Sequence, residues 1–160
     1  MYNFVYMKRE GKHRLSGFFR ARHILARVFS KEVISEPPPV KEGNMITLAD
    51  NNGVIRLSVS LENLYYMESD DNYVNVWYLD AKGRLSKHML RCRIGTIEER
   101  FKGTPLVRCH RKYIVNLDRV KMVRKESPGY ELDLDNDSIE PIPVSKTYKA
   151  GILKAFNSVS

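Results

Sequence analysis

The sequence has few of the features that mark membrane proteins, secreted scaffolds and zinc proteins. It contains only two cysteines, Cys92 and Cys109, and they do not form a CxxC pair, so neither a disulfide framework nor a zinc ribbon is expected. No apolar run approaches the roughly 20 residues needed to cross a bilayer, and the N-terminus lacks the apolar core of a signal peptide. We therefore expect a cytoplasmic protein with no transmembrane segment and with reduced thiols.

Motifs for catalysis and cofactor binding are also missing. There is no glycine-rich phosphate loop, no HExxH sequence and no nucleophile elbow. Residues 133–137 begin like a calcium loop, but Ser138 replaces the required glycine and Val144 replaces the bidentate glutamate. Cys109 and His110 are adjacent, and neighbours on a strand point to opposite faces, which favours a buried structural thiol over a nucleophile. We predict no enzyme activity, no catalytic residues, no metal, no cofactor and no small-molecule substrate.

The charge of the chain favours a polyanionic partner. The 160 residues include 27 Lys plus Arg against 19 Asp plus Glu, a formal net charge of +8. Residues 84–112 carry nine basic side chains and only two acidic ones, Glu98 and Glu99. Guanidinium groups bind phosphates and guanine edges in bidentate fashion, so such clustering suits a nucleic-acid reader. A solvated charged surface explains the composition equally well.

A run of prolines divides the chain into two unequal parts. Residues 37–39 are three prolines, which can continue neither a helix nor a central strand, so we predict a basic N-terminal segment at 1–43 and one domain at 44–160. Within the segment, apolar residues from 15 to 29 recur at near-helical spacing between arginines, which predicts a basic amphipathic helix. Docking on its own domain, docking on a second copy, and contact with a membrane surface or DNA are all open.

The period of the apolar residues changes from helical to two after residue 45, so the domain is predicted to be mainly β. Ile55, Leu57, Val59 and Leu61 alternate with polar residues and predict one apolar strand face. The spacing of apolar residues between Leu90 and Phe101 predicts one short interposed helix. The remaining predicted elements are strands at 73–79, 85–90, 106–107, 114–115, 120–123 and 130–134, and a C-terminal helix at 145–156 that buries Tyr148, Ile152 and Phe156.

Three ordered blocks make the domain similar to a known family. They are YYMESDDNYVNVWYLD at 65–80, RCHRKYIVNLD at 108–118 and IPVSKTYKAGI at 142–152, and together they resemble the LytTR domain, the DNA-binding domain of the bacterial LytR and AlgR response regulators. The resemblance covers residues 45 to 156. It implies an elongated arrangement of small antiparallel β-sheets with little helix, whose loops enter the major groove of DNA.

The resemblance also implies positions that bind DNA. They hold Asn72 with Asp71 in the loop before the 73–79 strand, Arg111 with Lys112 after His110, and Lys146 beside the closing serine. An asparagine can pair with adenine, an arginine with guanine, and a lysine with a phosphate or a guanine edge. Asn72 is equally a turn residue, and the cations are alternatively solvated surface charges.

Two further positions of the second block are expected to serve the structure. His110 and Asn116 are assigned to hydrogen bonds that fix loops, while the apolar residues between them are assigned to the core.

The N-terminal segment differs from the family pattern. LytTR response regulators carry a receiver domain with a phosphoacceptor aspartate, whereas residues 1–43 are too short for one and contain no aspartate. Regulation by another polypeptide, constitutive action and a remnant or fragment are all open. The leading prediction is a sequence-specific transcriptional regulator that binds double-stranded DNA as two copies on repeated half-sites. The alternative is a protein-interaction or membrane-surface adaptor that uses the basic N-terminal helix.

Overall fold

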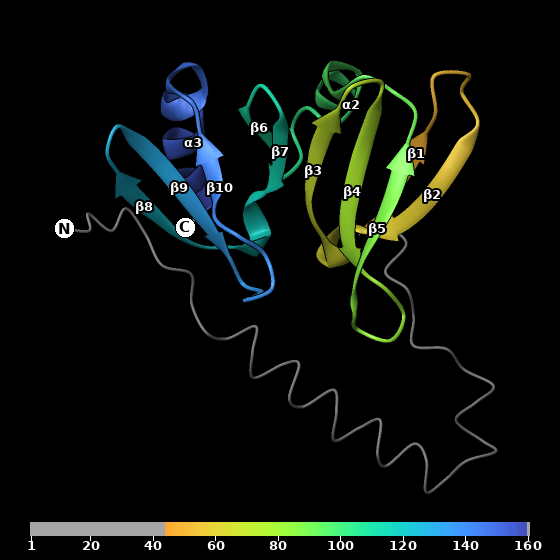
Figure 1. Cartoon of the computed structure of the whole chain (residues 1–160), viewed down its shortest axis with the longest axis horizontal. Coiled ribbons are helices and arrows are strands. Elements are labelled where there is room, and N and C mark those ends of the chain that lie inside the picture. Colours follow the sequence, from red (N-terminus) through yellow and green to blue (C-terminus); the bar gives the residue numbers. More distant parts are fainter. Residues whose placement is uncertain (1–43, 160) are drawn as a thin grey trace, which may run out of the picture. The chain divides into compact units, whose positions relative to one another are not determined.

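The computed structural model describes residues 44–159, which fold into three antiparallel sheets and two α-helices (Figure 1). The segment 1–43 and the amphipathic helix expected within it lie outside the described residues. A mainly β domain with one short interposed helix and a C-terminal helix was the prediction from the apolar periods, and the structure confirms it.

The central sheet has five strands in the order β5-β4-β3-β7-β6. Its strands are rich in Val, Tyr and Leu, which fit a pleated and half-buried surface. Val74 and Val76 on β4 are fully buried, whereas Tyr73 at the start of the same strand is exposed. The strands are β3 (Leu64–Asp70), β4 (Tyr73–Leu79), β5 (Leu85–Leu90), β6 (Leu106–His110) and β7 (Tyr113–Asn116).

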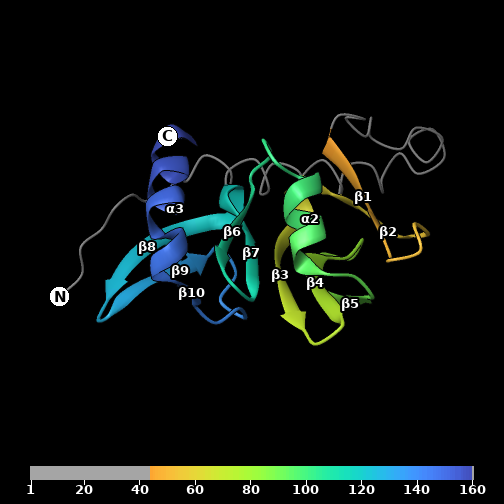
Figure 2. The same cartoon turned by 90° about the horizontal axis from the view of Figure 1, so that it is seen from above.

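One face of this sheet is covered by the interposed helix α2 (Ile94–Arg100) and by the hairpin of β1 (Met45–Ala49) and β2 (Ile55–Ser60). Leu48, Val59 and Ile97 from these elements join one buried cluster with residues of β3, β4 and β5. Figure 2 shows α2 lying across the sheet. The packing explains why so short a helix is stable, since isolated helices of this length are not.

Two details of this half differ from the sequence predictions. Ile55 is 60% exposed instead of contributing to a buried strand face, because it directly follows the β1–β2 turn and pairs with Ala49 at the turn end of the hairpin. The helix begins at Ile94, and Leu90 is the last residue of β5. The backbone N–H of Cys92 donates to the carbonyl of Leu90 at 3.1 Å, so the chain turns before the helix starts.

The second core lies between a three-stranded sheet and the C-terminal helix. Ile152 and Phe156 of the helix are buried against the sheet, as the spacing predicted, but Tyr148 is only half-buried, with its ring facing the guanidinium of Arg108. Strand β10 was not predicted, because three residues that include Pro143 carry no readable period. The elements are β8 (Val120–Glu126), β9 (Gly129–Leu134), β10 (Ile142–Val144), α3 (Lys146–Val159) and two 3-10 turns, η2 (Leu61–Asn63) and η3 (Leu117–Arg119).

Candidate nucleic-acid interface

The first predicted position lies on the two-residue turn between β3 and β4. Asp70 pairs with Tyr73 in the strand register, which leaves Asp71 and Asn72 as the turn. Asp71 has a φ of 52°, in the left-handed region that Asp and Asn tolerate better than most residues. Both side chains are exposed, so the amide of Asn72 is presented to solvent at the tip of a rigid hairpin.

The second predicted position is the two-residue turn between β6 and β7. His110 pairs with Tyr113, so Arg111 and Lys112 form the turn, and both side chains are exposed. The backbone N–H of Ser69 donates to the carbonyl of Lys112 at 2.7 Å. Since Ser69 is near the end of β3, this bond places the second turn beside the first at the same end of the sheet.

Arg108 fixes the second turn from within. Its Nε donates to the carbonyl of His110 at 2.9 Å, and its Nη2 donates to the carbonyl of Arg111. Its Nη1 forms an ion pair with Glu98 of α2 at 2.7 Å, and its side chain is only 13% exposed. Arg108 is one of the nine basic residues at 84–112 that suggested nucleic-acid binding, but its donors are directed at the protein.

His110 closes the same turn. Its Nδ1 accepts a hydrogen bond from the backbone N–H of Lys112 at 3.1 Å, and its ring lies 5.6 Å from that of Tyr113. Burial, together with the neighbouring charges of Arg111, Lys112 and Arg108, lowers the pKa of His110. A neutral imidazole is the form that can accept this bond. The predicted loop-fixing role of His110 is confirmed.

Asn116 fixes the opposite end of β7. Its side chain is fully buried, and its Nδ2 donates to the carbonyls of Leu61 at 2.8 Å and Leu64 at 2.7 Å. Its Oδ1 accepts from the backbone N–H of Asp118 at 3.0 Å. This side chain joins three segments by hydrogen bonds, which confirms its predicted structural role.

The third predicted position, Lys146, is the first residue of α3 and is exposed. The preceding residue, Ser145, donates its backbone N–H to the carbonyl of Cys109 at 3.0 Å. Lys146 therefore lies beside the end of β6 that leads into the Arg111 turn. A cation at a helix N-terminus opposes the helix dipole, so the position of Lys146 does not serve the stability of α3.

The exposed cations at these positions have no carboxylate partner. Among residues 44–159, Arg111, Lys112 and Lys146 take part in no ion pair. Several arginines elsewhere in the same part of the chain are paired with acidic side chains, namely Arg56, Arg84, Arg108, Arg119 and Arg124. The cations at the predicted positions therefore keep their charge available to an outside partner.

The described residues offer little else for chemistry. Within them, no three His, Cys, Asp or Glu side chains are grouped so that they could hold a metal ion, and no helix is long and apolar enough to span a membrane. Both cysteines are free, and burial raises the pKa of Cys92 to about 11 and that of Cys109 to about 12. Both thiols are therefore protonated at neutral pH, and the expected burial of Cys109 is confirmed.

A strand scaffold that exposes cations and an amide from neighbouring turns is compatible with a nucleic-acid-binding class of protein. Residues 56–157 match the family described as the LytTr DNA-binding domain, and the chain belongs to this family. Membership makes it a DNA-binding regulator and confirms the resemblance seen in the three sequence blocks.

A solved structure shares the fold. It is the LytTr DNA-binding domain of a Bacillus cereus protein described as a methyl-accepting/DNA response regulator, with 24% sequence identity and a TM-score of 0.50. The similarity covers 70% of this chain and 95% of that structure. No curated protein matches the chain.

Proposed function

We propose that the protein regulates transcription by binding specific duplex sequences, with the β3–β4 and β6–β7 turns in the major groove. The observation that carries the proposal is the adjacency of the exposed, unpaired side chains of Asn72, Arg111 and Lys146. Two backbone hydrogen bonds, Ser69 to Lys112 and Ser145 to Cys109, support it by bringing three distant parts of the sequence together.

The side chains proposed to contact DNA divide into two that read bases and two that bind phosphates. Arg111 is suited to guanine, whose O6 and N7 accept both donors of a guanidinium edge, and Asn72 is suited to adenine. Lys112 and Lys146 carry compact charges that suit phosphate oxygens, and Lys146 can alternatively reach a guanine edge. Phosphate contacts set the register on the duplex, and base contacts supply the sequence preference.

The major groove suits this arrangement for a geometric reason. It is about 12 Å wide and admits a two-stranded β-ribbon, and each base pair presents a distinct pattern of donors and acceptors there. Neighbouring two-residue turns are narrow, and their backbones are fixed by strand pairing. A preorganised backbone loses little conformational entropy on binding, which favours affinity.

The proposal is tested by selecting duplexes from a random library and measuring affinities by fluorescence anisotropy. Arg111→Ala should relax the preference at one base position at a cost of about 1–3 kcal/mol. Lys112→Ala should lower the affinity for all duplexes alike and reduce the slope of log affinity against log salt by about 1. If Arg111→Ala lowered the affinity for all duplexes equally, Arg111 would contact the DNA backbone and not a base. If the wild-type affinity did not depend on salt, DNA binding would be contradicted.

Modified bases distinguish the grooves. Replacing the guanine read by Arg111 with 7-deazaguanine removes the N7 acceptor in the major groove, so wild-type affinity should fall while the Arg111→Ala variant is unaffected. Inosine lacks only the amino group in the minor groove and should leave both affinities unchanged. Sensitivity to inosine alone would place the turns in the minor groove.

We further propose that two copies bind repeated half-sites. Sedimentation of the protein on duplexes with one and with two copies of the selected site should give stoichiometries of one and two. A stoichiometry of one on both duplexes would overturn the two-copy arrangement without affecting base reading.

A further inference from the structure

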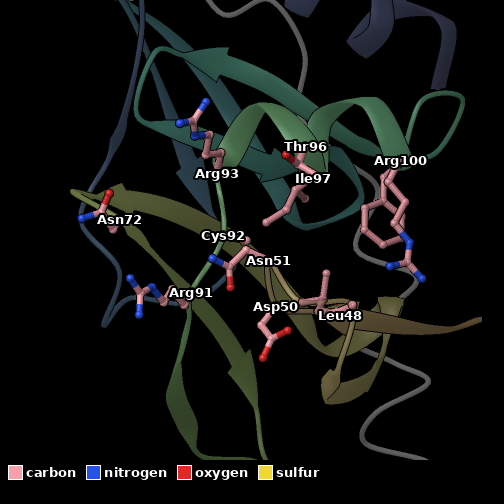
Figure 3. Close-up of a pocket in the computed structure, with 13 residues that line it drawn as sticks. Leu48, Asp50, Asn51, Asn72, Arg91, Cys92, Arg93, Thr96, Ile97 and Arg100 are labelled. Carbon is pink, nitrogen blue, oxygen red and sulfur yellow. The ribbon is translucent and has the colours of Figure 1, made fainter.

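A pocket of about 540 Å³ lies beside the β3–β4 turn, outside the positions assigned to DNA reading except for Asn72 (Figure 3). Its floor is formed by buried apolar side chains of the cluster between the central sheet, α2 and the β1–β2 hairpin. Its rim carries Asn72, Asn51 and three arginines, Arg91, Arg93 and Arg100. Figure 3 shows Arg91 and Arg93 on the same side of the pocket as Asn72.

The backbone that carries Arg91 and Arg93 is fixed. Cys92 between them is 7% exposed and anchors the connector from β5 to α2 in the core. The carbonyl of Arg91 accepts the backbone N–H of Asn51 at 2.8 Å, and the carbonyl of Arg93 accepts that of Thr96 at 3.0 Å. Cys92 is buried, whereas Arg91 and Arg93 on either side of it are exposed and lie on the rim of the pocket.

The pocket carries an excess of positive charge. Asp50 is the only carboxylate on its rim, and it accepts hydrogen bonds from Nε of Arg56 at 2.8 Å and from the backbone N–H of Asn52 and Val54. Within residues 44–159, neither Arg91 nor Arg93 takes part in an ion pair. This surface is therefore built to accept an anion.

Arg100 contributes to the same excess from across the pocket. Its Nη2 donates to Oγ1 of Thr47 at 3.1 Å, which orients the guanidinium without neutralising its charge.

We propose that Arg91 and Arg93 bind backbone phosphates of the same duplex whose bases Asn72 and Arg111 read. The proposal rests on the proposed function and extends the interface to the β5–α2 connector. A turn inserted in the major groove is flanked by both sugar-phosphate strands, so the cations next to Asn72 face a strand of phosphates. Guanidinium groups match phosphate oxygens in bidentate geometry. A free phosphate compound shares this chemistry but has no reason to require a position beside the reading turn.

The test uses the full chain, a selected duplex and a scrambled duplex of the same length. Arg91→Gln and Arg93→Gln should each lower both affinities by the same factor, on the order of five- to tenfold near 0.1 M salt. Each should also reduce the slope of log affinity against log salt by about 1, and Arg91→Lys should restore the slope. Arg84→Gln is the control for loss of one exposed arginine away from the pocket, because Arg84 directly precedes the other end of β5 and pairs with Asp80, and it should leave both affinities and the slope unchanged.

A single methylphosphonate, which lacks the phosphate charge, locates the contact. At one or two positions flanking the bases read by Asn72, it should weaken the wild-type chain and cause no further loss in Arg91→Gln or Arg93→Gln. Unchanged affinity and slope in both variants, while Arg111→Ala still alters base preference, would overturn this proposal and leave the proposed function intact. Calorimetric binding of inorganic phosphate that depends on Arg91, with DNA affinity unaffected, would likewise overturn it in favour of a free anion. A wild-type chain that binds no duplex would overturn the proposed function itself.

Discussion

Arg108 and Glu98 form an ion pair of 2.7 Å that connects the β6–β7 turn to helix α2. The same guanidinium donates to the carbonyls of His110 and Arg111 and lies 5.7 Å from the ring of Tyr148. One side chain thus holds the backbone of the proposed reading turn against both helices. The relationship predicts that Arg108 affects DNA binding without touching DNA.

Arg108→Ala should lower DNA affinity several-fold and reduce the free energy of unfolding by about 1–3 kcal/mol, because it leaves a partly buried carboxylate and two carbonyls without their donor. Urea denaturation and anisotropy measure the two effects. Arg124→Ala is the control, since that half-buried arginine pairs with Glu126, Glu131 and Asp133 on the three-stranded sheet. It should reduce stability alone. Unchanged DNA affinity in Arg108→Ala at a temperature where it remains folded would contradict the positioning role.

Asn116→Ala should reduce the free energy of unfolding by about 2–4 kcal/mol. The substitution leaves the buried carbonyls of Leu61 and Leu64 without a donor and the N–H of Asp118 without its acceptor. Asn72→Ala makes the same chemical change on an exposed turn and should alter stability by less than about 0.5 kcal/mol. Equal denaturation midpoints for the two variants would count against this account.

Stability should fall on acidification through His110. Its pKa in the folded protein is lowered below the ordinary value of 6.5, so the unfolded chain binds the proton first as the pH drops. The stability present above pH 6.5 is therefore lost as the pH falls from there toward the folded pKa. NMR titration of the imidazole should give an apparent pKa below 6.5. In urea denaturation from pH 7.5 to 5, His110→Gln should lose less stability than the wild type.

Stability should also fall at alkaline pH through Cys109. Burial raises the pKa of its thiol from about 9 to about 12, so the unfolded chain loses the proton first as the pH rises. Stability present below pH 9 is lost progressively between pH 9 and 12. The Cys109→Ala variant should show a shallower loss in this range. If iodoacetamide modified Cys109 in the native protein at pH 8 as fast as in urea, the thiol could not be buried.

The local features of this protein could be predicted from its sequence. The strand at 73–79 was readable because it is rich in β-forming residues between two turn clusters, and the strand at 130–134 because apolar and polar residues alternate with period two. The turn at 71–72 was readable from its polar residues before the 73–79 strand. The roles of His110 and Asn116 followed from the family blocks, and hydrogen bonds in the structure confirm them.

Tertiary structure alone decided which cations face solvent and which are used internally. Arg108 and Arg111 are three positions apart and chemically identical, yet Arg108 on β6 is paired with Glu98 of α2 whereas Arg111 is exposed on the β6–β7 turn. The phosphate contact proposed for Arg91 also depends on tertiary structure. Asn51 donates a hydrogen bond to the Arg91 carbonyl and Asn72 shares the pocket rim, and both are distant from Arg91 in sequence. Local pattern determined the elements, whereas the pairing of β3 with β7 determined the site, since strand register between distant segments depends on the packing of the whole core.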